Sequence, residues 1–101
     1  MKTLNNKNLK TINSKLLEYN VLNMIHDKRK DLEVKSEEWA YGSYCYRKAT
    51  LIAVDIYKEF GIAFMSEKFL QTEIIPNEDF YKESLERAWD NWQEFKQKEV
   101  A

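Results

Sequence analysis

The residues best suited to catalysis in this sequence are one histidine and one cysteine. His26 and Cys45 are each the only residue of their type, so a histidine-activated nucleophile would have to use this pair, or His26 with a serine. Their spacing indicates no shared site, and a lone histidine beside a basic run is ordinarily solvated. With no catalytic residues to assign, the sequence predicts a protein that is not an enzyme.

Motifs for cofactors and metals are also missing from the sequence. Gly42 and Gly61 are the only glycines, which excludes a glycine-rich phosphate-binding loop. The residue three positions before His26 is Asn23, so the Glu-x-x-His motif of di-iron bundles is not present. We expect neither a cofactor nor a metal, and we interpret Gly42 as a point of close helix crossing.

Charge is distributed unevenly along the chain. Residues 1–35 carry eight Lys/Arg against four Asp/Glu, whereas residues 66–101 carry five against nine. At helical spacing, five acidic residues of the last third form one stripe: Asp79, Glu83, Glu86, Asp90 and Glu94. This acidic stripe is either a solvated face, matched in part by a basic first helix nearby, or a surface that binds a basic protein partner.

A second candidate surface combines aromatic and basic side chains in the middle of the chain. Its members are Tyr44, Arg47, Lys48 and Lys58. Such groups can stack on bases and contact phosphates. The net charge of −1 argues against a dedicated nucleic-acid-binding protein. This flank is therefore the alternative binding site, and otherwise it is a solvated flank of the central helix.

The element that positions most of these side chains is a helix over residues 36–60, expected at the centre of the fold. Ser36 suits its N-cap, Glu37 and Glu38 suit its first turn, and Gly61 suits the left-handed residue after its end. Its broad apolar face comprises Trp39, Cys45, Tyr46, Ala49, Ile52, Ala53, Ile56, Tyr57 and Phe60. Other apolar residues on the opposite side predict neighbours on both flanks.

Two more long helices are expected on either side of this one. The first starts near Asn13 or Ser14 and ends near Lys28, after residues 1–11 that we expect to fray. Its apolar pattern is blurred, with Leu17, Val21, Met24 and Ile25 on one face, so it is either buried on several sides or partly free for another protein. The last helix follows Pro76 and Asn77, with Asn77 as its N-cap.

The connection at residues 62–75 has two interpretations. Ser66 can cap a short helix that runs to about Gln71. Alternatively, β-branched and aromatic residues at 62–65 and 72–75 could pair as two short strands, which would make an α+β fold. We favour the short helix.

Together these elements predict a single all-α domain over residues 1–101, a small bundle of three long helices and one short helix. Glycine and proline are too scarce for a fold with many tight turns. The lone cysteine excludes an internal disulfide, the N-terminal ten residues lack an apolar signal-peptide core, and no apolar stretch could span a bilayer. We therefore expect a cytoplasmic protein without a membrane partner.

The functional class that remains is a non-enzymatic protein–protein interaction module. It would occupy a basic surface of its partner through the acidic stripe, as an inhibitor, antitoxin, immunity protein or phage anti-defence protein does. One alternative is a nucleic-acid-binding regulator that uses the Tyr44–Lys58 flank. Another is a homo-oligomeric structural protein that uses its abundant aromatic residues, which make up 14% of the chain.

Overall fold

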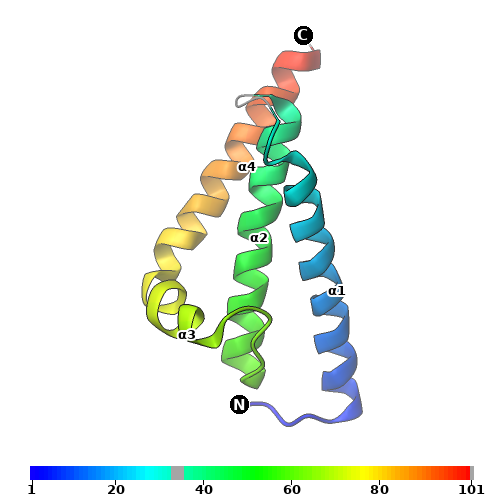
Figure 1. The fold of residues 1–101 in the computed structure, drawn as a ribbon, viewed down its shortest axis with the longest axis vertical. Coiled ribbons are helices and arrows are strands. Elements are labelled where there is room, and N and C mark those ends of the chain that lie inside the picture. The colour runs from blue at the N-terminus through cyan, green and yellow to red at the C-terminus, as the bar shows by residue number, and fades with distance from the viewer. Residues whose placement is uncertain (33–35, 101) are drawn as a thin grey trace.

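Three long helices lie side by side, with the central one between the other two (Figure 1). The computed structural model describes residues 1–32 and 36–100. The long helices are α1 (Asn6–Arg29), α2 (Glu37–Phe60) and α4 (Glu78–Val100). The connection contains α3 (Glu67–Phe69), the π-helical turn η1 (Leu70–Ile74) and the 3₁₀ turn η2 (Ile75–Asn77). No described residue belongs to a strand. This confirms the all-α prediction and excludes the strands proposed at 62–65 and 72–75.

The three long helices form a layer that is one helix thick. α1 and α4 each pack along α2 and, within the described residues, barely contact each other. The chain measures 50 × 27 × 21 Å, with a radius of gyration of 15.2 Å. A compact domain of 100 residues has a radius of gyration of roughly 13 Å, so the layer is elongated and exposes two broad faces.

The central helix has the ends that the sequence predicts. The Ser36 hydroxyl accepts a hydrogen bond from the Trp39 backbone N–H at 3.1 Å. At the other end Gly61 adopts a φ of 70°, and its N–H donates to the Tyr57 carbonyl at 2.8 Å. A side chain would be strained in this left-handed conformation, which is why a glycine ends the helix here. Ile52 is buried as predicted, with 9% of its surface exposed.

The first helix begins earlier than predicted, at Asn6 and not near Asn13 or Ser14. The physical reason is a cap: the Asn5 side chain accepts a hydrogen bond from the Asn8 N–H at 2.8 Å, which satisfies one of the free donors of the first turn. Ahead of it, the Lys2 N–H donates to the carbonyl of Glu59 near the end of α2. The chain start is therefore attached to the central helix.

The side of α1 that packs on α2 differs from its most apolar face. Ile12 is buried against Ile56 and Phe60. In contrast, Leu17, Val21 and Met24 point away from α2 and expose 67%, 43% and 54% of their surface. Of the two interpretations of the blurred pattern, the structure fits a helix with one apolar face that no described part of the chain covers.

The connection from α2 to α4 begins as the sequence predicts and then continues without a break. Ser66 caps α3 by accepting from the Phe69 N–H at 3.3 Å. The helical path widens at η1, where the Ile75 N–H bonds to the Leu70 carbonyl. A wider turn just before Pro76 accommodates a residue that lacks an N–H and whose ring would clash in a regular helix.

This continuous path makes the predicted N-cap of the last helix wrong. Asn77 has helical geometry inside η2, and its side chain donates to the Glu73 carbonyl at 2.8 Å. The Asn77 side chain thus points back along the chain and does not accept from the first turn of α4. The chain needs no cap at this position because α4 extends a helix that is already formed.

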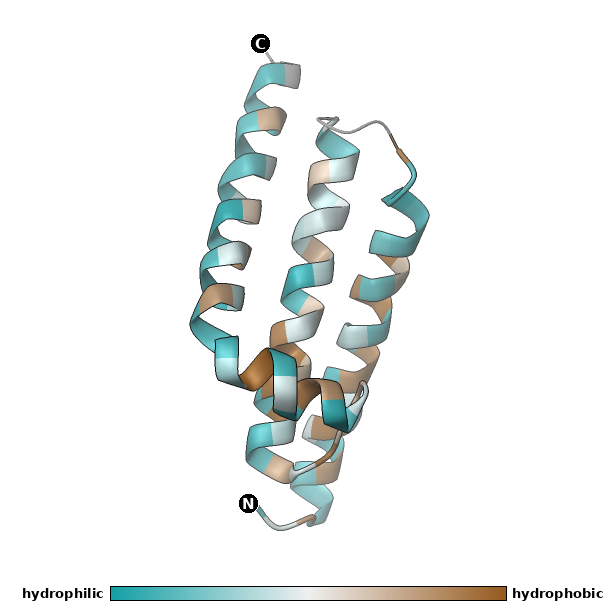
Figure 2. Ribbon diagram, turned by 60° about the vertical axis from the view of Figure 1, so that its left-hand side comes forward, coloured by the Kyte–Doolittle hydropathy of each residue, from teal (hydrophilic) through white to brown (hydrophobic). Residues whose placement is uncertain are grey.

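The connection also supplies the tightest part of the core. Leu70 and Ile74 are 0% and 2% exposed and pack on Ala53 and Val54 of α2. Figure 2 shows strongly hydrophobic residues gathered where this segment crosses α2. Small residues on α2 let the connection approach closely, and the larger residues of the connection fill the space.

We expect Leu70→Ala to lower the free energy of unfolding by about 2–5 kcal/mol, because it removes a fully buried side chain and leaves a cavity. Phe69→Ala is the matched control, since Phe69 is adjacent in sequence but 42% exposed, and it should cost about 0.5 kcal/mol or less. Urea titrations followed by circular dichroism measure both. Equal losses would show that the connection is not packed as described.

Candidate interaction surfaces

The acidic stripe lies on the outer face of α4, where all five of its carboxylates are exposed. Two of them pair within the helix: Glu83 lies 3.9 Å from Arg87, and Glu94 lies 3.4 Å from Lys98. In the part of the chain that the structure describes, no cation pairs with Asp79, Glu86 or Asp90. The stripe therefore carries a net negative charge toward solvent.

The basic first helix does not neutralise this stripe. α1 packs on the far side of α2 from α4 (Figure 1). Two cations of α1 form described ion pairs, Lys15 with Glu18 at 3.3 Å and Arg29 with Glu38 of α2 at 3.5 Å, and neither pair involves α4. The interpretation in which α1 matches the stripe is therefore wrong for this fold.

Aromatic side chains fill the contact between α2 and α4. Tyr44 lies 5.2 Å from Trp89 and 5.6 Å from Trp92, measured between ring centroids. The two tryptophans make an edge-to-face contact at 5.3 Å, a preferred geometry for aromatic pairs. Trp92 is fixed further by a hydrogen bond from its indole N–H to Glu37. These rings hold α4 at a defined angle on the N-terminal half of α2.

Trp89 is only partly covered by this packing and remains 44% exposed. It forms, with Tyr44, Leu85, Glu86 and Asp90, an open pocket of about 520 Å³ that we call the Trp89 pocket. Glu86 and Asp90 belong both to this pocket and to the acidic stripe. Helical spacing aligns Trp89 with Leu85, Ala88 and Trp92 on one apolar face of α4, so the sequence alone does not indicate an exposed ring beside the stripe.

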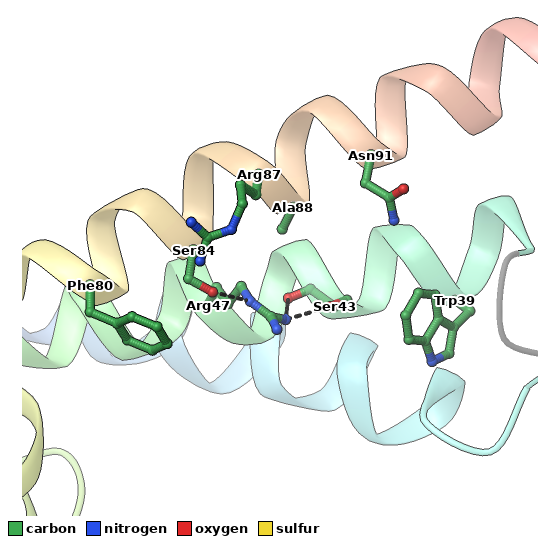
Figure 3. A pocket seen from close by; sticks show the side chains of 8 residues that line it. All are labelled: Trp39, Ser43, Arg47, Phe80, Ser84, Arg87, Ala88 and Asn91. Carbon is green, nitrogen blue, oxygen red and sulfur yellow. Dashed lines mark hydrogen bonds between the residues drawn. The ribbon is translucent and has the colours of Figure 1, made fainter.

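The alternative basic flank is divided among several intramolecular contacts. Arg47 lies between α2 and α4, where its Nε donates to Ser84 at 2.6 Å and one Nη donates to the Ser43 carbonyl at 3.1 Å (Figure 3). Lys58 pairs with Glu78 at 3.0 Å. These two cations thus join α2 to α4.

The other two members of this flank face different neighbours. Lys48 lies 3.9 Å from Glu18 of α1 and above the Tyr44 ring. Tyr44 itself belongs to the aromatic contact with α4. The structure therefore does not bring Tyr44, Arg47, Lys48 and Lys58 together as one continuous basic surface.

His26 and Cys45 occupy a structural contact between α1 and α2. Cys45 is completely buried, and this burial raises the pKa of its thiol above the ordinary value. The His26 ring lies 4.7 Å from the Tyr46 ring. In the same contact, a Cβ added to Gly42 of α2 would lie 2.9 Å from the Arg29 Cβ of α1. This confirms Gly42 as the point of close helix crossing.

The described residues contain no group of three or more His, Cys, Asp or Glu side chains arranged to hold a metal ion. None of the helices, over the residues that the structure describes, combines the length and apolar character needed to cross a membrane. Among the described residues, the candidate interaction surfaces are the acidic stripe with the Trp89 pocket, and a second pocket around Arg47.

We expect Lys58→Ala to destabilise the fold at pH 7 but less at acidic pH. The hydrogen bond from Lys58 holds the pKa of the Glu78 carboxyl below its usual value, and Lys82 contributes in the same direction. A carboxyl with a lowered pKa in the folded state stabilises the fold above its unfolded pKa, and this contribution disappears as the pH falls through the folded pKa.

The loss at pH 7 should be no more than about 1 kcal/mol, since Lys58 is half exposed and its charge is screened. Urea titrations at pH 7 and pH 3 measure this difference, with Lys68→Ala as a control lysine on the exposed surface of α3. A loss of stability that is the same at both pH values would mean that the Glu78 carboxylate is not the partner.

Comparisons with known proteins do not assign a family or a function to the chain. No protein-family model matches the chain, and neither the curated proteins nor the solved structures provided a match.

Proposed function

We propose that this protein is a non-enzymatic interaction module that binds a basic surface of another protein through the outer face of α4. One observation carries the proposal: Glu86 and Asp90, which pair with no described cation, border the half-exposed Trp89 ring in an open pocket. Carboxylates beside an exposed indole suit a lysine or arginine side chain, which gains an ion pair and a cation–π contact at once.

The charge pattern of α4 favours such a partner energetically. Asp79 and Glu83, Glu86 and Asp90, and Asp90 and Glu94 are like-charged pairs at i,i+4 spacing. Each pair costs an isolated helix a few tenths of a kcal/mol. A basic partner removes this repulsion on binding, and the field of the stripe speeds the encounter. Tryptophan is also among the residues that most often dominate binding energy at interfaces.

The biological role that fits this activity is to block the partner. A small protein that covers a basic surface, such as a nucleic-acid-binding groove, prevents its normal ligand from reaching it. Inhibitors, antitoxins, immunity proteins and phage anti-defence proteins act in this way, and we propose this class of function. We place the protein in the cytoplasm, since its single cysteine suits a reducing compartment.

We expect the double variant Glu86→Lys/Asp90→Lys to abolish partner binding while its unfolding free energy stays unchanged or rises. The fold loses no described ion pair at these positions. The pair at positions 86 and 90 stays like-charged, while the repulsion between Asp90 and Glu94 becomes an attraction. The partner is first captured with the wild-type protein from its native host, with and without nuclease treatment. Its affinity for both forms is then measured at two salt concentrations.

The matched control is Asp55→Lys/Glu73→Lys, which makes the same charge change at exposed positions of α2 and η1. It should retain binding and most of the salt dependence, whereas the α4 variant should lose both. Equal effects of the two variants would reject α4 as the binding face. Capture that is lost on nuclease treatment would favour the nucleic-acid-binding alternative.

A homo-oligomeric structural role is the second candidate, and the exposed face of α1 favours it. Leu17, Val21 and Met24 occur at helical spacing and lie on the side away from α2. A second copy could cover them. If this is the function, sedimentation velocity should show a stable oligomer that Val21→Glu converts to monomers. A wild-type protein that sediments as a monomer at all concentrations would reject this role.

A further inference from the structure

The contact between α2 and α4 forms a second pocket, which shares no residue with the Trp89 pocket. It is an open groove of about 470 Å³ lined by Trp39, Ser43, Arg47, Phe80, Ser84, Arg87, Ala88 and Asn91, which we call the Arg47 groove (Figure 3). This volume lies in the range of small-molecule sites. The small side chains of Ser84 and Ala88 leave room between the two helices.

Arg47 is held in this groove by both helices. It donates from Nε to the Ser84 hydroxyl of α4 and from Nη1 to the carbonyl and hydroxyl of Ser43 in α2. All of these acceptors are neutral, and no carboxylate among the described residues pairs with Arg47. A partly buried guanidinium without a counter-ion carries a desolvation cost that an arriving anion would offset.

A second guanidinium is available from α4. The Arg87 side chain extends toward Ser84, which Arg47 contacts from the other helix (Figure 3). Its only described ion pair is the 3.9 Å contact with Glu83, in which both side chains are more than 60% exposed. Such a pair contributes little, so Arg87 is free to turn toward a ligand. Asn91 adds an amide that can donate to the same space.

The two ends of the groove are aromatic. Trp39 lies at one end and Phe80 at the other (Figure 3), and Phe80 is 58% exposed. Their faces can stack on a planar ring, a contact that tolerates every nucleobase. Guanidinium groups in turn match the geometry of phosphate oxygens, which they bind through two parallel hydrogen bonds.

We propose that the Arg47 groove binds a phosphate attached to a nucleoside, with the phosphate between Arg47 and Arg87 and the base on Trp39 or Phe80. This inference does not depend on the acidic stripe, because the two sites use different residues. The phosphate can come from a free nucleotide or from the end of a single-stranded nucleic acid. Both sources present the same chemical group to the groove.

The test is a titration with adenosine monophosphate followed by ¹H–¹⁵N NMR at low ionic strength. We expect shifts of the Arg47 Nε–H and Trp39 indole N–H signals, and binding at least about tenfold tighter than that of inorganic phosphate or adenosine alone. Arg47→Lys should weaken binding about tenfold or more, because lysine keeps the charge but loses the guanidinium geometry. Arg87→Ala should weaken it about two- to fivefold.

Lys82→Ala is the matched control, since it removes one exposed cation of α4 outside the groove. An equal loss for Lys82→Ala and Arg87→Ala would overturn the site and indicate general charge attraction. The site would also be overturned if inorganic phosphate bound as tightly as the nucleotide. Unchanged NMR signals of Arg47 and Trp39 at millimolar nucleotide would overturn it as well. If Arg47→Lys fails to fold, the affinity of Arg87→Ala relative to Lys82→Ala and the shift of the Trp39 indole signal still test the proposed site. A 5′-phosphorylated octadeoxyadenylate that binds tighter than the mononucleotide supports the site and identifies a nucleic acid as its source.

Discussion

The burial of Leu70 and Ile74 against Ala53 and Val54 is the contact on which the rest of the arrangement depends. It fixes the connection to one side of α2 and directs α4 back along that helix. Because α1 packs on the other side of α2, the long helix that α4 packs along, in the described part of the chain, is α2. The outer face of α4 is thereby turned to solvent, and the two pockets lie along its contact with α2.

The parts of the fold that local physics determines were predictable from the sequence. The caps at Ser36 and Gly61, the short helix after Ser66 and the close approach at Gly42 each depend on one residue type at one position. The start of α1 could not be predicted from the sequence, because Asn5 and Asn8 lie in a polar stretch that has no apolar periodicity. The prediction that Asn77 caps α4 was wrong because the chain is already helical before Asn77, so α4 has no free first turn there for Asn77 to cap.

The candidate sites were predictable in part, for a similar reason. The five carboxylates of the stripe share one face of α4 whatever that helix packs against, so helical spacing alone identifies them. Two other features depend on how α2 and α4 cross. They are the exposure of Trp89 and the hydrogen bonds that Arg47 donates to Ser43 and Ser84. No single-helix pattern carries that information, which is why the basic flank looked continuous in the sequence and is divided in the structure.

A layer one helix thick also has a consequence for the lifetime of the protein. Outside the part that the connection covers, the broad faces of the layer are exposed to solvent. Local opening of the outer helices should therefore be easier than global unfolding. Anything that binds only the folded layer raises its stability by mass action, by about 2.7 kcal/mol when its concentration is 100 times its Kd. A partner that binds only the folded layer would therefore increase the resistance of the protein to proteolysis and raise its abundance.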